Sequence, residues 1–210
     1  MTKFLVVFDV DSTLINEEAI ELLAERAGTR EMVAAVTERA MRGELDFAQS
    51  LIERVATLKG LDESILAEVS HQLTPTKGAS DLIREIHARG GQAAAVSGGF
   101  IQLLGPVKKA LNFDLERANT LEVMDGKLTG RVLGKIIDRQ AKADSLLEWA
   151  ASLGVQLADT IAVGDGANDL GMMEVAGLSV AFCAKPVVQE KAKVALNERD
   201  LGKLIELLPA

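Results

Sequence analysis

Four short apolar segments, separated along the chain by helical patterns, constrain the fold more than any other feature of the sequence. They lie at residues 4–10, 92–96, 160–163 and 178–181, and they are rich in Val, Ala, Ile, Leu and Phe. None shows the two-residue alternation of a half-buried strand, so we expect both faces of each strand to be covered. Buried strands that alternate with helices predict an α/β fold, in which a Rossmann-like parallel sheet has helices on both faces.

The segment between the first two predicted strands breaks this alternation. Residues 15–75 contain helical patterns and no convincing strand, and Asp46 followed by Gln49 is typical of a capping box at the start of a helix. We therefore predict an α/β core domain of residues 1–14 and 76–210. The helical cap domain of residues 15–75 would be inserted after the first strand.

The rest of the chain supplies the helices of the core and one predicted hairpin. Helical patterns at residues 79–88, 101–111 and 141–153 lie between the predicted strands. The pair Asp125-Gly126 is typical of a tight two-residue turn, and apolar residues alternate on both sides of it. This pattern predicts a small β-hairpin insertion.

Composition excludes several classes of function. The chain has 31 acidic and 23 basic residues, a net charge of −8, which argues against a nucleic-acid partner or an anionic membrane surface. No apolar run approaches the roughly 18 residues of a membrane span. Cys183 is the only cysteine, so no intrachain disulfide can form, as is usual in a reducing compartment. We expect a cytoplasmic protein.

Two carboxylates, those of Asp9 and Asp11, directly follow the first predicted strand. One acid at a strand end is usually a turn or capping residue. Two neighbouring carboxylates repel each other and raise a pKa, unless a positive charge shares the site. A divalent cation is the simplest solution, and oxygen ligands of this kind suit Mg²⁺.

A second acidic cluster, Gly164-Asp165-Gly166-Ala167-Asn168-Asp169, follows the third predicted strand. Taken alone, it could be an Asp-Gly turn in which Asn168 caps the next helix. Because carboxyl ends of parallel strands meet at one edge of a sheet, we expect it to face Asp9 and Asp11. The two clusters together favour a metal site.

Two weaker features complete the pattern. Ser97-Gly98-Gly99 follows the second predicted strand and is expected to open the helix at residues 101–111. A hydroxyl beside the free amides of a helix N-terminus can bind an anion, although the same residues are also common in ordinary loops. Lys142, near the start of the helix at residues 141–153, would on its position alone be a surface lysine.

Taken in order, these elements resemble the four motifs of the haloacid dehalogenase superfamily of phosphotransferases. That superfamily has Asp-x-Asp-x-Thr, a Ser or Thr at a strand end, a Lys, and a Gly-Asp-x-x-x-Asp loop. Here the motifs stand as Asp9-Val10-Asp11-Ser12-Thr13, Ser97, Lys142 and Gly164-Asp165-Gly166-Ala167-Asn168-Asp169. They span nearly the whole chain, and together they are far more specific than any one of them.

The resemblance implies a role for each motif residue. Asp9 would be the nucleophile, Asp11 the general acid and base, and Mg²⁺ would be bound by Asp9, Asp165 and the main-chain carbonyl of Asp11. The phosphoryl oxygens would be held by Ser97, Gly98 and Lys142. Asn168 would contact the substrate or a metal-bound water, and Asp169 would orient the metal site and Lys142.

A closer similarity, to the phosphoserine phosphatase family, rests on Asp-x-Asp-Ser-Thr, Ser-Gly-Gly-Phe and Gly-Asp-Gly-Ala-Asn-Asp, all present here. It implies hydrolysis of O-phospho-L-serine, the last step of serine biosynthesis, and therefore a phosphorylated amino acid as the small-molecule partner. In that family the cap carries an acid and an arginine for the amino-acid part of the substrate, which by spacing are Glu18 and Arg54. Met41 and Phe47 would form an apolar wall, or would simply be core residues.

Glu18 and Arg54 have structural alternatives, namely an acid in the first turn of a helix and a solvated charge. Arg54 follows Phe47, Ser50 and Leu51 at helical spacing, which places it on an apolar stripe where a guanidinium needs a partner. Other functions also stay open. They are a phosphatase or phosphotransferase for another small metabolite, a phospho-accepting signalling module of the receiver type, and an inactive phosphate-binding scaffold.

Overall fold

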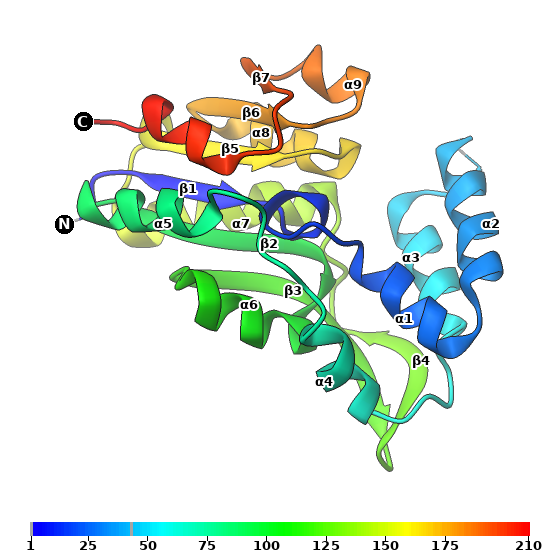
Figure 1. Ribbon diagram of the computed structural model, residues 1–210. Helices are drawn as coiled ribbons and strands as arrows, with labels where there is room; N and C mark the ends of the chain where they lie inside the picture. The colour runs from blue at the N-terminus through cyan, green and yellow to red at the C-terminus, as the bar shows by residue number, and fades with distance from the viewer. Residues whose placement is uncertain (1, 43) are drawn as a thin grey trace.

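A seven-stranded sheet forms the centre of the molecule (Figure 1). The computed structural model describes residues 2–42 and 44–210. The strand order is β4-β3-β2-β1-β5-β6-β7, and all neighbours are parallel except β3 and β4. The strands are β1 (Leu5–Phe8), β2 (Gln92–Phe100), β3 (Leu115–Met124), β4 (Lys127–Leu133), β5 (Thr160–Gly164), β6 (Leu178–Phe182) and β7 (Val194–Leu196).

Helices cover both faces of the sheet, as predicted. The helices of the chain are α1 (Ala19–Ala27), α2 (Arg30–Met41), α3 (Phe47–Ala56), α4 (Ser64–Ser70), α5 (Ala79–Ala88), α6 (Leu104–Leu111), α7 (Arg139–Leu153), α8 (Leu170–Val175) and α9 (Pro186–Gln189). Alternate residues of β1 point to opposite sides. Phe4, Val6 and Phe8 pack in one core cluster with α5 and α6, whereas Leu5 and Val7 pack in a second cluster with α7 and α8. The fold class predicted from the sequence is confirmed.

The predicted hairpin is also present, but its first strand does more than expected. Asp125 and Gly126 both have left-handed φ values, 51° and 72°, which suit a tight turn between β3 and β4. Before the turn, β3 pairs in parallel with β2, so it extends the main sheet. The sequence did not predict this pairing, or the three-residue strand β7.

One expectation about local structure is wrong. Ser97, Gly98 and Gly99 belong to β2, which continues to Phe100, so they do not open a helix. A single turn of 3-10 helix, Ile101–Leu103, follows the strand after Phe100 and leads directly into α6 at Leu104. Two glycines at the end of a strand resemble a loop in the sequence, because glycine rarely favours an extended strand.

Helices α1–α4 come from the segment between β1 and α5. Figure 1 shows α1, α2 and α3 beyond the carboxyl ends of the central strands. The predicted capping box of Asp46 and Gln49 starts α3. The two chain segments that join these helices to the rest of the fold lie together, with a bridge between Ile15 and Pro75 and a hydrogen bond from the Asn16 amide to the Thr74 carbonyl at 3.1 Å.

Candidate active site

The floor of the site is a buried ion pair network around Lys142. This side chain is fully buried, and its Nζ lies 2.5 Å from Asp9 Oδ1 and 2.6 Å from Asp169 Oδ1. Asp9 directly follows β1, Asp169 follows β5, and Lys142 comes from the first turn of α7, where Asp138 caps the helix. Burial alone would lower the pKa of Lys142, but Asp169 and Asp9 outweigh it and raise that pKa. Lys142 is therefore positively charged at neutral pH.

Asp169 joins this lysine to the loop after β5. Its Oδ2 accepts hydrogen bonds from the backbone amides of Asp165, at 3.1 Å, and of Gly166, at 2.9 Å. The same carboxylate fills the space where a side chain at Gly164 would lie, which explains the glycine there. Both oxygens of Asp169 thus have protein partners, and the residue fixes the position of Lys142 and of the loop.

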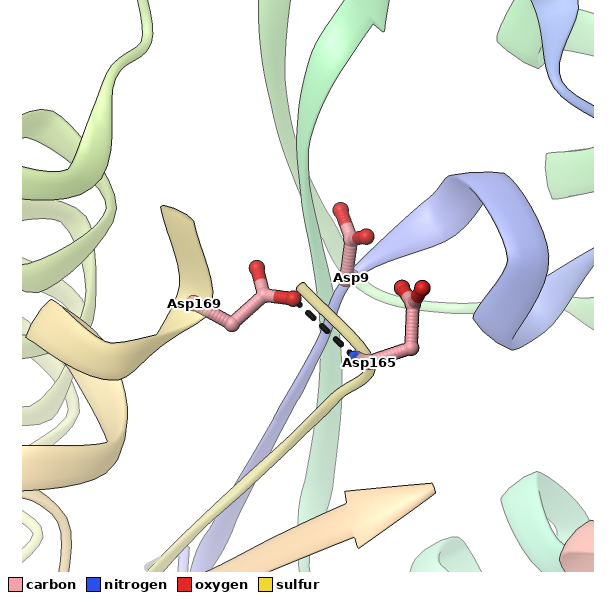
Figure 2. Close-up of side chains that lie close together, drawn as sticks. All are labelled: Asp9, Asp165 and Asp169. Atoms are coloured by element: carbon pink, nitrogen blue, oxygen red, sulfur yellow. Dashed lines mark hydrogen bonds between the residues drawn. The ribbon is translucent and has the colours of Figure 1, made fainter. Parts of the chain in front are cut away.

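The residues present fit a divalent metal ion. Figure 2 shows the carboxylates of Asp9, Asp165 and Asp169 converging on one region, and an oxygen of each lies within 4.8 Å of the others. Burial, followed by the charge of Asp169, raises the pKa of Asp165 to about 6, and burial also raises the pKa of Asp9. A cation would relieve this repulsion, and carboxylates are the hard ligands that Mg²⁺ prefers. Since both oxygens of Asp169 are engaged, Asp9 and Asp165 are the better ligands.

Asp11 is held by one hydrogen bond to each of its carboxylate oxygens. Oδ1 accepts the backbone amide of Ala19 at 2.8 Å, and Oδ2 accepts the Ser97 hydroxyl at 3.2 Å. The Gly99 amide donates to Ser97 Oγ at 2.7 Å, so this amide serves the serine. Burial raises the pKa of Asp11, although the Ala19 amide and the Ser97 hydroxyl partly offset it. The protonated form of Asp11 is therefore more accessible than that of a free aspartate.

A cavity of about 350 Å³ lies above this floor. On one side it is lined by the segment after β1, by β2 and by the loops after β5 and β6, with Asp9, Asp11, Gly98, Gly99, Phe100, Asp165, Gly166, Asn168 and Lys185. Its lining from α1, α2 and α3 and the residue before α1 comprises Glu18, Ile20, Glu21, Thr37, Phe47, Leu51 and Arg54. The two sides meet where Phe47 packs on Gly98, since a Cβ at that glycine would lie 2.6 Å from Phe47 Cζ.

Two charged groups of opposite sign face the cavity from this second side. Arg54 Nε donates to the Ser50 carbonyl at 3.2 Å, and no carboxylate of the described residues pairs with its guanidinium. Burial lowers the pKa of Arg54, which shows how poorly solvated the group is. Glu18 accepts the Ser12 hydroxyl at 2.7 Å. Surrounding protein atoms, and then Asp11, raise its pKa to about 7.

The structure brings the residues singled out in the sequence into one place. Asp9, Asp11, Glu18, Phe47, Arg54, Gly98, Asp165 and Asn168 line the cavity, and Ser97, Lys142 and Asp169 lie beneath its lining. Met41 ends α2, but its side chain lies outside the part of the chain that the structure describes. The roles of these residues remain predictions.

Four further residues were missed. Thr13 donates from its hydroxyl to Asp165 Oδ1 at 3.4 Å, and Glu21, Thr37 and Lys185 line the cavity. Glu21 lies three residues after Glu18, a spacing that puts both on one side of a helix. Lys185 follows β6, at the same edge of the sheet as the acidic loops, so the rule that ligands bind at strand carboxyl ends could have found it.

Comparison with known proteins decides the family. The family model for haloacid dehalogenase-like hydrolases matches residues 6–174. The chain belongs to this family. The phosphoserine phosphatase of Streptococcus thermophilus is 52% identical over 206 residues, which cover 98% of this chain and 96% of that protein. The phosphoserine phosphatase of Streptomyces coelicolor is 53% identical over 97% of this chain, but the match covers only half of that longer protein.

Solved structures of this hydrolase family agree with the sequence matches. A phospho-aspartyl intermediate analogue of phosphoserine phosphatase and a substrate-bound phosphoserine phosphatase complex each give a TM-score of 0.93. Both are 44% identical to this chain, with 100% of each chain covered. The resemblance inferred from the four motifs is confirmed, and the chain is a hydrolase of the phosphoserine phosphatase branch. This finding favours an enzyme over a receiver-type signalling module.

No helix within residues 2–42 and 44–210 combines the length and the apolar character that crossing a membrane requires. The prediction made from the apolar runs in the sequence agrees with this finding. The absence of a nucleic-acid partner stays a prediction from the net charge.

The ion pairs of Lys142 predict a large effect on stability. We expect Lys142→Met to lower the free energy of unfolding of the metal-free protein by about 3–5 kcal/mol at pH 7, because two carboxylates stay buried without their cation. Urea denaturation in EDTA measures the change. Lys135→Met is the matched control, since Lys135 is 71% exposed and pairs with Asp144 at the surface. It should cost no more than about 0.5 kcal/mol. Equal losses in the two variants would contradict the structural importance of the network.

Proposed function

We propose that this enzyme hydrolyses O-phospho-L-serine to L-serine and inorganic phosphate through an aspartyl-phosphate. The observation that carries the proposal is a cavity with Asp9 at its floor, backed by Lys142, and with Arg54 and Glu18 on its other side, neither of which has an ion-pair partner among the described residues. These groups suit the phosphate, the carboxylate and the ammonium of one small substrate. The similarity to phosphoserine phosphatases over nearly the whole chain supports the same activity.

The first step is attack on phosphorus by a carboxylate oxygen of Asp9. Lys142 binds Oδ1, and among the described residues no donor binds Oδ2, which is therefore available as the nucleophile. The bond between phosphorus and the serine oxygen breaks as the Asp9–phosphorus bond forms. Asp11, protonated, gives its proton to the departing serine oxygen. Its raised pKa makes the acid form accessible for this transfer.

The second step reverses the role of Asp11. As a carboxylate it takes a proton from water, the water oxygen attacks phosphorus, and Asp9 is released together with inorganic phosphate. The hydrogen bond from the Ala19 amide keeps Asp11 in place in both steps, while the Ser97 hydroxyl, which bonds Asp11 in this structure, would turn to the phosphoryl group.

The phosphoryl oxygens would be held by the Ser97 hydroxyl, the Gly98 amide and Lys142, whose donors favour developing negative charge. Mg²⁺ held by Asp9, Asp165 and the main-chain carbonyl of Asp11 would neutralise part of the phosphate charge. Asp169 fixes the position of Lys142 relative to the loop 164–166, because it bonds to both. Asn168, which lines the cavity, would contact the substrate or water bound to the metal.

Substrate recognition falls to the segment 15–75, which we propose as a cap domain on a core of residues 1–14 and 76–210. Arg54 would bind the substrate carboxylate through paired hydrogen bonds, and Glu18 its ammonium. Phe47, with Met41, would form the apolar wall, and closure of the cap would exclude water until serine leaves. The proposed activity would give the enzyme a role in serine biosynthesis. The single cysteine favours a cytoplasmic location.

A phosphate-release screen tests the proposed function. Phosphoserine should be the best substrate among phosphorylated amino acids and sugars, and EDTA should abolish turnover until Mg²⁺ is added.

We expect Asp9→Asn to lower kcat by about 10⁴-fold or more, because the amide cannot form the phosphoenzyme. Substantial turnover by this variant would refute the nucleophile. Transfer of phosphate to added alcohols, measured by product analysis, would instead identify a phosphotransferase.

Arg54 provides a test of substrate recognition. Arg54→Ala should lower kcat/KM for phosphoserine by about 100-fold, since the substrate carboxylate would lose its charged partner. An aryl phosphate without a carboxylate should be affected far less. Arg39→Ala is the matched control, because Arg39 pairs with Glu44 and Glu53 on the surface of α2 and α3. Equal losses on both substrates would contradict the recognition role.

Glu18 predicts a pH dependence with a definite sign. Its pKa of about 7 means that it is neutral below this pH and a carboxylate above it. An ammonium group pairs only with the carboxylate, so kcat/KM for phosphoserine should rise as pH increases through 7. Inhibition by 3-phosphoglycerate, in which a hydroxyl replaces the ammonium, should weaken over the same interval. Glu18→Gln should abolish both trends, and an unchanged profile in this variant would exclude Glu18 as their cause.

A further inference from the structure

The pairing of β2 with β3 is irregular beside the active site. Val96 pairs with Arg117, but the next pair is Phe100 with Asn119. Four residue steps on β2 therefore match only two on β3, so two extra residues bulge out where Ser97, Gly98 and Gly99 lie. Residues in a bulge lose their regular backbone hydrogen-bond partners on the neighbouring strand, which leaves these backbone groups available for other contacts. Bulges are common next to active sites.

Asn119 supplies a hydrogen-bond partner to this bulge from its side chain. It is 1% exposed, and its Nδ2 donates to the Gly98 carbonyl oxygen at 2.8 Å. A buried carbonyl normally needs a donor, and here the donor is an amide side chain on the neighbouring strand. The position of the Gly98 peptide is thus tied to Asn119.

The other end of the same amide reaches the segment that leads into α7. Asn119 Oδ1 accepts the backbone amide of Ile137 at 2.9 Å. Ile137 precedes Asp138, the residue that caps α7, and the Lys142 amide donates to the Asp138 carbonyl at 2.9 Å. One buried side chain therefore connects the Gly98 peptide to the first turn of the helix that carries Lys142.

This connection requires both functions of the amide group. The Gly98 carbonyl needs a donor and the Ile137 amide needs an acceptor, and asparagine offers one of each at fixed separation. Aspartate would keep the acceptor but would place a second acceptor against the Gly98 oxygen. Leucine would keep the approximate shape and lose both bonds.

We propose that Asn119 is a positioning residue that sets Gly98 and Lys142 at the right separation for one phosphoryl group. The proposal rests on the proposed function, which assigns both of these groups to the phosphate. Asn119 itself touches no reacting atom. Its effect is exerted through the Gly98 peptide and the start of α7. Loss of these two hydrogen bonds, which we call the Asn119 clamp, should therefore misplace both Gly98 and Lys142 relative to the phosphoryl group.

The chain offers a matched control in Gln102. Its side chain makes the same pair of bonds to one residue of the hairpin strand, donating to the Leu121 carbonyl at 2.7 Å and accepting the Leu121 amide at 3.2 Å. Gln102 does not line the cavity. Asn119→Leu and Gln102→Met both replace an amide with an apolar side chain of similar size, and both remove two hydrogen bonds to the backbone.

The test compares thermal unfolding, phosphoserine kinetics and competitive inhibition by inorganic phosphate in wild type, Asn119→Leu and Gln102→Met. We expect similar falls in Tm for the two variants. Only Asn119→Leu should lose kcat/KM, by about tenfold to 100-fold, and bind phosphate correspondingly more weakly. Asn119→Asp, which keeps the bond to Ile137 but buries a carboxylate against the Gly98 oxygen, should show the kinetic loss with a larger fall in Tm.

Kinetic constants of Asn119→Leu or Asn119→Asp within twofold of those of Gln102→Met would overturn the proposal. So would failure of both Asn119 variants to fold, because the residue would then be required for the fold as a whole. Absence of phosphoserine turnover in the wild type contradicts the proposed function instead. In that case weaker binding of inorganic phosphate by Asn119→Leu than by Gln102→Met still supports the clamp, and equal binding overturns it.

Discussion

The site depends on one buried positive charge. Lys142 lies in the interior without contact to solvent, and such a group is tolerated only when carboxylates surround it. Asp9 and Asp169 meet this need, and in doing so they join the ends of β1 and β5 to the first turns of α7. The lysine in turn allows two acids to stay close together and fixes Oδ1 of Asp9, which leaves Oδ2 for the attack that we propose. The same ion pairs therefore hold the fold together and arrange the groups to which we assign the reaction.

Residues at the carboxyl ends of strands were predictable from the sequence, because each lies next to an apolar segment that identifies its strand. Asp9 and the loop that ends at Asp169 belong to this class. Arg54 was also predictable, since a charge on an apolar helical stripe needs a partner. In each case the signal is local, and one topological rule brings the local signals together.

What could not be predicted depends on contacts between distant segments. Gly98 looks like a loop residue, and only the folded chain, in which β2 continues to Phe100 and pairs there with Asn119, shows that it belongs to a strand. Asn119 looks like an ordinary polar residue near a hairpin, and its two partners lie 21 and 18 positions away. Lys142 resembles a surface lysine, because nothing near it in the sequence indicates that it is buried. Burial and pairing are properties of the folded chain.

The loop after β1 links chemistry to recognition more closely than the motifs suggest. Asp11 accepts the first amide of α1, while Ser12, in a left-handed conformation with φ of 56°, donates to Glu18. The two acids to which we assign proton transfer and ammonium binding, Asp11 and Glu18, thus each bond to the other end of the short segment that separates them. The burial that raises the pKa of Glu18 is reinforced by the charge of Asp11. A proton on Asp11 therefore favours the carboxylate form of Glu18, so the state ready to protonate the leaving oxygen is also the state that binds an ammonium.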